Sequence, residues 1–317
     1  MRKFALSINF MNRKYRFFYS AIVFAILLNN QIFAQQTDIK TYLAQKLAGI
    51  QLKDGNKTIK KGISLSEICD LNDPVANRVF REYGAMFVGK DDVFAGFRLI
   101  NNDNKIKFFV NCVFKDEREV NSYQTSIRTK SANIGGTNIE LREDALDALL
   151  AAIEEGRQKG LRITPRGGSI AARRSYQDTA RLWDSRFYPA LTYWVGKGRI
   201  SRQDAEAAKS SGIGAQVKQV LEWEDKKLWF SKDLSKSILY SVAAPGASQH
   251  IFMVALDVEQ YASKGVRDLL AEHGWFQTVK SDMPHFTYLG VERNKLKSLG
   301  LMSVPSGGQE FWIPKMD

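Results

Sequence analysis

The stretch that most constrains this 317-residue chain is SQHIFMVALDV, an apolar run with a histidine before it and an aspartate near its end. The chain has three histidines, and His250 stands at the start of this run, seven positions before Asp257. A short apolar run bounded by turn residues predicts a buried strand. Two interpretations stay open at this point: a core strand with polar ends, or a strand that carries two ligands of a metal site.

A second histidine has a distinctive context, because His285 follows Pro284 and lies three residues after Asp282. Two imidazoles and one carboxylate form a complete protein ligand set for catalytic zinc, with the fourth position left for water. His250, Asp257 and His285 therefore form a candidate Zn²⁺ site. An acid at Asp282 would stand near the metal without binding it, as a general base must. The alternative is that each histidine is a hydrogen-bonded structural residue.

The third histidine, His273, lies in the last turn of a predicted helix, directly before Gly274. A cation at that position interacts favourably with the helix dipole. We therefore leave His273 out of the site.

The chain after residue 139 predicts helices mixed with a few short strands. Apolar spacing predicts a helix over 141–160, and a second over 171–195 that is broken near Pro189. Strands and helices do not alternate regularly, which is typical of an α+β fold. The other predicted helices cover 201–211, with Ser201 as N-cap, 216–223 and 263–274, and the predicted strands cover 161–164, 237–242, 275–279 and 285–291.

The N-terminus resembles a targeting signal. The basic stretch MNRKYR precedes the short apolar run FFYSAIVFAILL, and IFA follows. This pattern predicts a secretory signal peptide over residues 1–34 with cleavage after Ala34, and hence a periplasmic or secreted protein that meets the membrane only during export. An uncleaved membrane anchor is the alternative.

Charge and composition give weaker indications about partners. Five of the 46 lysines and arginines lie before residue 35, where there is no acid, so the remaining chain carries a net charge of +7 against its 34 acids. That suits an anionic wall polymer. No Lys/Arg stripe with interleaved aromatics is present, so we do not expect nucleic-acid binding.

Residues 35–135 predict a smaller N-terminal α/β domain of unknown role. It holds a predicted helix over 73–87, a predicted hairpin over 97–110, and both cysteines, Cys69 and Cys112. In an oxidising compartment these cysteines are candidates for a disulfide, with two free buried thiols as the alternative. A polar stretch at 129–138 predicts a linker to a second domain over 136–317.

The motifs around the histidines resemble a known family, the zinc D-alanyl-D-alanine carboxypeptidases and dipeptidases of the vancomycin-resistance type, with their relatives the L-alanyl-D-glutamate endopeptidases. SQHIFMVALD, from Ser248 to Asp257, is similar to the family pattern SxHxxGxAxD. DMPH, from Asp282 to His285, is similar to (E/D)xxH, and ARRSYQDTARLW is similar to an arginine-serine-tyrosine helix start. The resemblance covers roughly residues 140–290 and not the N-terminal third.

This resemblance implies a hedgehog/D,D-peptidase-like fold, with helices packed around a small antiparallel sheet, and Zn²⁺ as cofactor. It implies that Arg174 stabilises the oxyanion, although Arg173 is adjacent and the register is open by one residue. Ser248 matches a position that touches substrate, or it caps the turn after Pro245 and Gly246. The implied roles are metal ligands for His250, Asp257 and His285, general base for Asp282, and substrate contacts for Ser248 and Arg173.

Two residues depart from the family pattern. Met253 stands where the family has glycine, which allows backbone torsions that methionine does not. Asp282 stands where the carboxypeptidase branch usually has glutamate, and this form is closer to the endopeptidase branch.

Taken together, the sequence predicts an exported zinc metallopeptidase that acts on peptidoglycan stem peptides, as a D-Ala-D-Ala carboxypeptidase. An L-Ala-D-Glu or cross-link endopeptidase is the enzymatic alternative. A non-catalytic cell-envelope binding module on the same fold is the alternative of another class, and Met253 is its main support.

Overall fold

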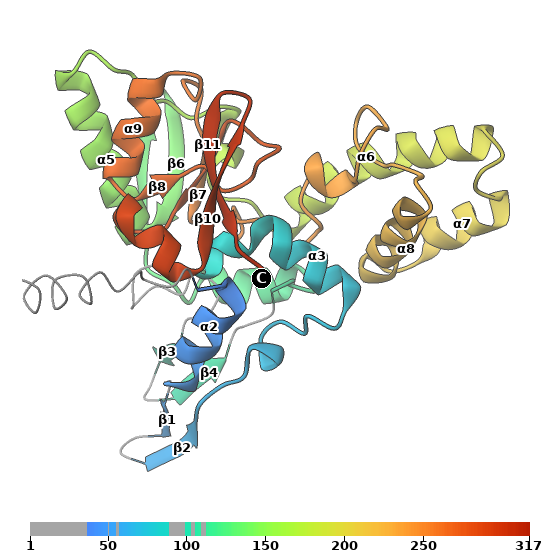
Figure 1. The fold of residues 1–317 in the computed structure, drawn as a ribbon, viewed down its shortest axis with the longest axis horizontal. Coiled ribbons are helices and arrows are strands. Elements are labelled where there is room, and N and C mark those ends of the chain that lie inside the picture. Colours follow the sequence, from blue (N-terminus) through green and yellow to red (C-terminus); the bar gives the residue numbers. More distant parts are fainter. Residues whose placement is uncertain (1–36, 50, 55–56, 89–98, 103–104, 109–111) are drawn as a thin grey trace, which may run out of the picture. The chain divides into compact units, whose positions relative to one another are not determined.

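The computed structural model describes residues 37–317, apart from 50, 55–56, 89–98, 103–104 and 109–111 (Figure 1). The predicted signal peptide lies outside the described residues. In the described part of the chain, no helix combines the length and apolar character needed to cross a membrane. Residues Thr37–Asp317 form one compact unit.

A small antiparallel sheet lies at the centre of the C-terminal half. Its strand order is β7-β9-β8, so β9 is flanked on both sides. The three strands are β7 (Ala255–Asp257), β8 (Trp275–Phe276) and β9 (His285–Tyr288). This mixture of helices and small antiparallel sheets confirms the predicted α+β class.

The register of β7 and β9 separates a core face from a polar face. Leu256 lies opposite Phe286, and Asp257 lies opposite His285. Because side chains alternate along a strand, the first pair and the second pair point to opposite faces. Leu256 and Phe286 are buried in a hydrophobic cluster, so Asp257 and His285 share the face turned away from it.

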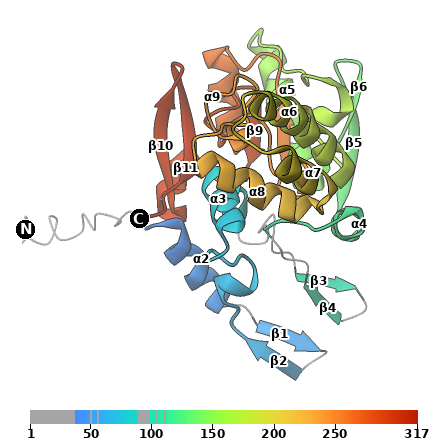
Figure 2. The ribbon, with the colours of Figure 1, turned by 90° about the vertical axis from the view of Figure 1, so that its right-hand side faces the viewer.

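Two helices cover the apolar face of this sheet. They are α5 (Glu143–Gln158) and α9 (Lys264–Glu272), which lie side by side in Figures 1 and 2. Leu149 and Leu269 belong to the same cluster as Leu256. The N-cap of α9 is Ser263, whose side chain accepts a hydrogen bond from the amide of Val266.

A second group of helices follows in the chain, α6 (Tyr176–Gly196), α7 (Arg202–Ser210) and α8 (Ile213–Asp225). Helix α6 begins with a capping box formed by Ser175 and Asp178. The predicted break at Pro189 is wrong, since α6 runs through this residue. Pro189 is exposed, so the carbonyl that loses its amide partner can bond to water instead.

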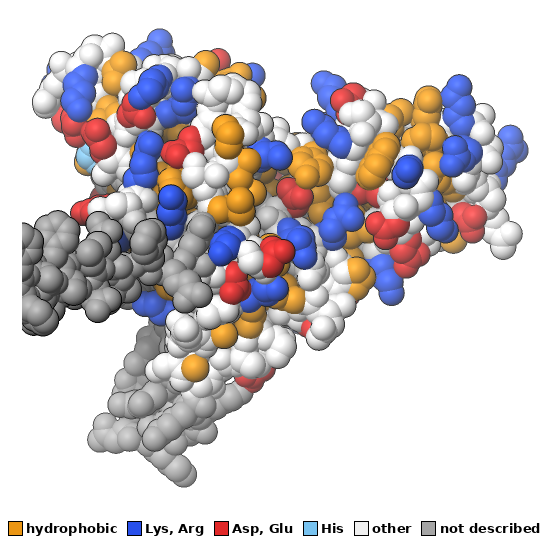
Figure 3. Space-filling model, in the orientation of Figure 1, with side chains coloured by type: hydrophobic (Ala, Val, Ile, Leu, Met, Phe, Trp, Pro, Cys, Tyr) orange, Lys and Arg blue, Asp and Glu red, His pale blue; other side chains and the backbone are white. Residues whose placement is uncertain are grey.

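The surface over α6–α8 is rich in Lys and Arg side chains (Figure 3). Exposed basic residues occur along all three helices and the turns that join them. They include Arg181, Lys197, Arg199, Arg202, Lys209, Lys218 and Lys226.

The N-terminal elements are short. The predicted hairpin over 97–110 is confirmed by the antiparallel pairing of β3 with β4, and the predicted helix over 73–87 corresponds to α3 and η2. The elements are α2 (Ile39–Ala48), β1 (Gln51–Asp54), β2 (Lys57–Lys61), η1 (Leu65–Glu67), α3 (Pro74–Tyr83), η2 (Gly84–Phe87), β3 (Leu99–Asn102), β4 (Lys105–Phe108) and α4 (Glu117–Gln124).

Residues on both sides of the predicted boundary near 135 share their cores. The predicted linker forms the hairpin of β5 (Thr129–Ile134) and β6 (Thr137–Arg142). Ile139 of β6 packs in the cluster of α5 and α9. Phe80 and Phe114 lie in one buried cluster with C-terminal residues that include Phe252 and Met316. The N-terminal segments therefore belong to the same packed body as the strands of the central sheet.

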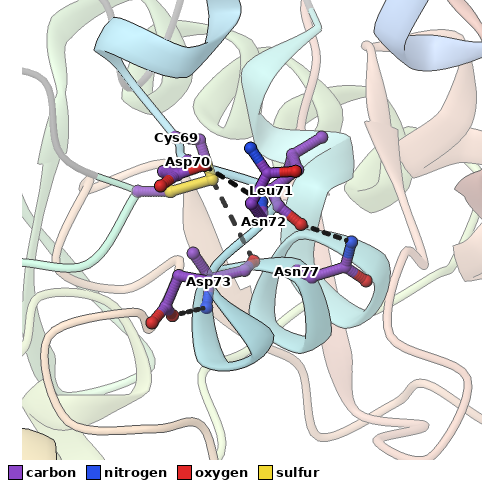
Figure 4. Close-up of a disulfide and its surroundings, with 8 residues drawn as sticks. Cys69, Asp70, Leu71, Asn72, Asp73 and Asn77 are labelled. Atoms are coloured by element: carbon purple, nitrogen blue, oxygen red, sulfur yellow. Dashed lines mark hydrogen bonds between the residues drawn. A yellow bond between two sulfur atoms is a disulfide. The ribbon is translucent and has the colours of Figure 1, made fainter.

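The structure joins Cys69 and Cys112 in a disulfide across a sequence separation of 43. Both residues are buried. Figure 4 shows the bond beside the start of α3, where the carboxylate of Asp73 accepts from the amide of Ala76 and Asn77 donates to the carbonyl of Leu71. The disulfide therefore ties the segment that begins at Cys112 to the start of a core helix.

Several predicted strands differ from the structure. Residues 161–164 form no strand, 275–279 reduce to β8, and 237–242 contain the 3₁₀ helix η4 (Ile238–Tyr240). The amide of Ile238 donates to Glu224 Oε1 at 2.6 Å, and that of Leu239 donates to Ser237 Oγ. These bonds occupy the donors that a strand ladder would need.

The C-terminal hairpin was not predicted. It consists of β10 (Leu301–Ser306) and β11 (Gln309–Pro314), joined at two glycines with positive φ, Gly307 and Gly308. The remaining 3₁₀ helices are η3 (Gly168–Ala171) and η5 (Arg293–Leu299).

Candidate metal centre and active-site pocket

Three side chains meet at the polar face of the central sheet. Candidate ligand atoms of His250, Asp257 and His285 all lie within 4.8 Å of one another. The Nε2 of His250 and the Nδ1 of His285 are 3.1 Å apart, and each lies 3.3–3.4 Å from Asp257 Oδ1. Asp257 and His285 come from facing positions of β7 and β9, and His250 comes from the turn before β7.

The apolar run around His250 is mostly turn and not strand. Amides of Ile251, Phe252 and Met253 donate in succession to the carbonyls of residues three positions earlier, and β7 begins only at Ala255. The expectation of one continuous strand is therefore wrong for residues 251–254. These turns bring His250 back toward the end of the strand that it precedes.

Met253 ends this series of turns in a left-handed conformation, with φ of 57°. An L-residue in this region costs about 1–2 kcal/mol relative to an ordinary conformation. The Met253 side chain is fully buried in the hydrophobic core and does not line the pocket. Position 253 thus has the backbone conformation that favours glycine, and the methionine side chain packs in the core and not in the pocket.

The tautomer of His250 is fixed by a backbone carbonyl. Its Nδ1 lies 2.8 Å from the carbonyl oxygen of Ala172. A carbonyl only accepts, so Nδ1 carries the proton and Nε2 presents a lone pair toward Asp257. Burial lowers the pKa of His250 to about 4, aided by the charge of Arg174, so the ring is neutral at pH 7.

The tautomer of His285 is fixed through Gln249. The Nε2 of Gln249 donates to the carbonyl of Tyr83 at 3.1 Å, which orients the amide. Its Oε1 therefore faces the Nε2 of His285 at 2.7 Å and accepts from it. Thr287 also donates to this oxygen. The Nδ1 of His285 is left with a lone pair that points at His250 and Asp257.

These contacts leave three acceptors facing one another. Asp257 Oδ1 is a buried oxygen with no hydrogen-bond partner in the described chain. Two imidazole lone pairs and an unpartnered carboxylate oxygen at 3.1–3.4 Å repel one another unless a cation lies among them. The donor set of two neutral imidazoles and one carboxylate suits Zn²⁺, and the locked tautomers are those that a metal requires.

Arg174 and Arg173 point to different places. The Nη2 of Arg174 pairs with the outer oxygen of Asp257, Oδ2, at 2.7 Å. Arg173 instead pairs with Glu140 at 2.6 Å and donates to Gln124 at 2.9 Å, and it does not line the pocket. The structure therefore brings Arg174 to the site and turns Arg173 away from it.

Asp257 is held as a carboxylate. Burial opposes its ionisation, and the guanidinium of Arg174, 2.7 Å from Oδ2, favours the charged form. The ion pair with Arg174 fixes the orientation of the group, so that Oδ1 faces the two histidines.

A pocket of about 330 Å³ opens beside the three acceptors. Asp282 is one of the residues that line it. Desolvation by the surrounding protein raises the pKa of Asp282, and the negative charge of Asp257 adds to this effect. Ser248 also lines the pocket, while its Oγ accepts from the amide of His250 at 3.4 Å. Asp282 and Ser248 are thus placed beside the candidate metal site.

The N-terminal region supports the turn that carries His250. Gln124 donates from its Nε2 to the carbonyls of Arg174 and Ile251 at 2.9 and 3.0 Å. Phe114 donates its amide to the carbonyl of Gly246 at 2.9 Å. A Cβ on Gly246, which has φ of 81°, would lie 1.9 Å from the carbonyl oxygen of Phe114. Glycine is therefore required where this segment approaches the turn.

Sequence reasoning missed several of these supports. Gln249 could have been singled out, because it lies between two motif residues, Ser248 and His250. Tyr83 and Gln124 carry no comparable signal, since Tyr83 is 166 positions from Gln249 and Gln124 is 127 positions from Ile251. His273 lies outside the site as predicted and bonds to Glu155 at 2.9 Å.

Comparisons with known proteins give distant structural similarity. No family model matches the chain, and no curated protein matches it. A Zn(II) complex of a mutant of the vancomycin-resistance D,D-pentapeptidase VanY, from a VanB-type cassette, is 16% identical over 64% of this chain and 93% of that chain, with a TM-score of 0.34.

Two further solved structures are similar at the same level. VanYB in complex with D-alanine-D-alanine is 16% identical over 54% of this chain and 83% of that chain, with a TM-score of 0.32. The LdcB LD-carboxypeptidase is 17% identical over 50% of this chain and 64% of that chain, with a TM-score of 0.30. Similarity this low assigns neither family nor activity, so the site itself must carry any functional conclusion.

Proposed function

We propose that this protein is an exported zinc metallopeptidase that hydrolyses peptidoglycan stem peptides, as a D,D-carboxypeptidase. One observation carries the proposal. Two imidazoles with locked tautomers and an unpartnered carboxylate oxygen meet at 3.1–3.4 Å beside a pocket. The peptide substrate follows from the resemblance of the SxHxxGxAxD and DxxH motifs.

His250, Asp257 and His285 would hold the metal. A bound zinc ion supplies Lewis acidity and lowers the pKa of a water molecule. Asp282 would accept the proton of the attacking water and pass it to the leaving nitrogen, so that its carboxylate is regenerated in each turnover.

Arg174 would have two tasks. Its Nη2 orients Asp257, and its position in the pocket lining lets the guanidinium face a developing oxyanion. Its Nε is already bound to the carbonyl of Ile170 at 2.9 Å, which holds the side chain in place. Preorganised donors of this kind are effective because they need no rearrangement during the reaction.

Export is supported by two features. Residues 1–34 have the pattern of a secretory signal. The disulfide between Cys69 and Cys112 suits an oxidising compartment.

An endopeptidase that cleaves L-Ala-D-Glu or cross-link bonds is the second candidate. The aspartate at position 282 favours it, because that form of the motif is closer to the endopeptidase branch. Product analysis separates the two activities, since a carboxypeptidase releases free D-alanine from a pentapeptide and an endopeptidase releases a longer fragment.

Metal analysis paired with peptide hydrolysis tests the proposal. We expect one equivalent of zinc, loss of that zinc in His285→Ala, and retained zinc with at least 100-fold lower turnover in Asp282→Asn. Stoichiometric zinc without hydrolysis of any stem peptide would indicate a non-catalytic envelope-binding module. A purified protein that binds no zinc would contradict both.

A further inference from the structure

The pocket extends well beyond the candidate metal centre, along one face of α6. Thr179, Leu182 and Arg186 all line it, at the i, i+3 and i+7 spacing of a single helix face. Arg186 is ten residues into α6 from Tyr176, which corresponds to about 15 Å of helix. Tyr240 and Ser241 also line it, next to Arg186.

The two ends of the pocket differ in whether their charged side chains form ion pairs within the chain. Arg174 is paired with Asp257 at 2.7 Å, and Asp282 lies near His285 at the metal end. No carboxylate among the described residues lies within 4 Å of Arg186. The end of the pocket away from the metal centre therefore presents a cation with no ion-pair partner among the described residues.

The hydrogen bonds of Arg186 orient its guanidinium and leave donors over. Its Nε donates to Ser241 Oγ at 2.9 Å, and its Nη1 donates to Ser185 Oγ at 2.8 Å. A guanidinium has five N–H groups, so one remains on Nη1 and two on Nη2. These two nitrogens can bind both oxygens of one carboxylate.

We propose that Arg186 binds a free carboxylate of the peptide substrate, at a residue removed from the scissile bond. This inference rests on the proposed peptidase function and names a feature of its substrate. Helical side chains lean toward the helix N-terminus, so the guanidinium lies nearer to the metal centre than its Cα does.

The chemistry of stem peptides supplies such groups. A γ-linked glutamate and a diamino acid each leave a carboxylate free along the backbone. No described carboxylate forms an ion pair with Arg186, so its guanidinium is complementary in charge to such a group.

Matched peptides test this inference. Two stem peptides are compared that differ only in one internal carboxylate, present as the free acid or as the carboxamide. For the metal-loaded wild type we expect kcat/KM to be 10- to 100-fold higher for the acid, mostly through KM. In Arg186→Gln we expect this ratio to fall to about one, and in Arg186→Lys to an intermediate value, because lysine keeps the charge without the planar fork. Arg202→Gln removes the same charge from an exposed position outside the pocket and should keep the wild-type ratio.

Binding measurements separate this inference from the proposed function. Calorimetry with metal-loaded Asp282→Asn measures the affinity for both peptides without turnover. If the wild type cleaves no peptide but the acid binds more tightly through Arg186, the peptidase proposal fails and the carboxylate site stands. If cleavage occurs and Arg186→Gln weakens acid and amide equally, or neither peptide binds, the carboxylate site is overturned.

Discussion

The N-terminal region, residues 37–127, and the segment from 248 to 285 contribute to the candidate site in different ways. The later segment supplies each of the three candidate metal ligands. The N-terminal region supplies none of them, but its Tyr83 carbonyl orients Gln249, its Gln124 holds the turn of His250, and its Phe114 packs against Gly246. The N-terminal region thus acts on the ligands only through residues that support them, and none of these contributing N-terminal residues lies in a recognisable motif.

The largest effect is expected from removing a ligand charge. Asp257→Asn keeps the shape of the side chain but places a neutral group between two imidazole lone pairs and Arg174. We expect zinc affinity to fall at least 1000-fold, or about 4 kcal/mol, measured by competition with a chelator. Asp268→Asn, an equivalent change on α9, should keep full affinity. Unaltered zinc binding in Asp257→Asn would show that the three side chains do not form the metal site.

The second prediction concerns the disulfide of the N-terminal region. Replacing Cys69 and Cys112 by serine releases a 43-residue separation, which corresponds to at most about 4 kcal/mol of stability. We expect the free energy of unfolding to fall by about 2–4 kcal/mol in chemical denaturation. The folded double variant should still bind one zinc, because every ligand is retained. Equal stability of wild type and variant would contradict a supporting role for this segment.

The third prediction tests the link between the two regions. Gln249→Leu removes the acceptor of His285 and leaves the carbonyl of Tyr83 without its donor. Loss of a residue that orients a metal ligand typically weakens metal affinity 10- to 100-fold, and we expect that range here.

Gln249→Glu is the matched variant for this test. It keeps an acceptor for His285 and should bind zinc more tightly than Gln249→Leu. If the two variants bind zinc equally, the hydrogen bond to His285 does not determine the affinity.

The smallest effect isolates the strain at Met253. At an ordinary buried position, alanine is about 0.5–1 kcal/mol more stable than glycine. With φ of 57°, we expect the order to reverse, with Met253→Gly about 1 kcal/mol more stable than Met253→Ala. Both should be less stable than wild type, because each deletes a buried methionine side chain, worth about 2–5 kcal/mol. Chemical denaturation measures the free energy of unfolding of the three proteins. A more stable Met253→Ala than Met253→Gly would contradict a left-handed conformation at Met253.

The sequence anticipated the parts of this site that depend on local pattern. Apolar spacing predicted α5, a helix ending at Gly274 was predicted where α9 lies, and the motif residues His250, Asp257 and His285 come together as the metal interpretation requires. The register of Arg173 and Arg174 was undecidable, because both precede the same helix start and only tertiary partners distinguish them. Glu140 and Gln124 hold the first, and Asp257 holds the second.

Other features depend on contacts that no local pattern encodes. The turns at 250–253 form within an apolar run that reads as strand, because the left-handed Met253 and the i to i+3 bonds override β propensity. Residues 237–242 do not form the predicted strand. The buried side chains of Glu224 and Ser237 accept hydrogen bonds from the amides of Ile238 and Leu239, which a strand would need as donors. The polar stretch at 129–138 predicts a linker but lies in the hairpin of β5 and β6, since the turn glycines of this hairpin resemble those of a flexible segment.

The two fixed tautomers have a consequence for the metal-free chain. With both outer nitrogens bonded to acceptors, neither imidazole can turn its proton inward without breaking a buried hydrogen bond. The metal-free protein must therefore fold around a cluster of mutually repelling electron pairs, a repulsion that the proposed zinc ion would relieve. On this proposal folding and metal uptake are coupled thermodynamically, so the transition temperature should rise with free zinc concentration and fall in a chelator.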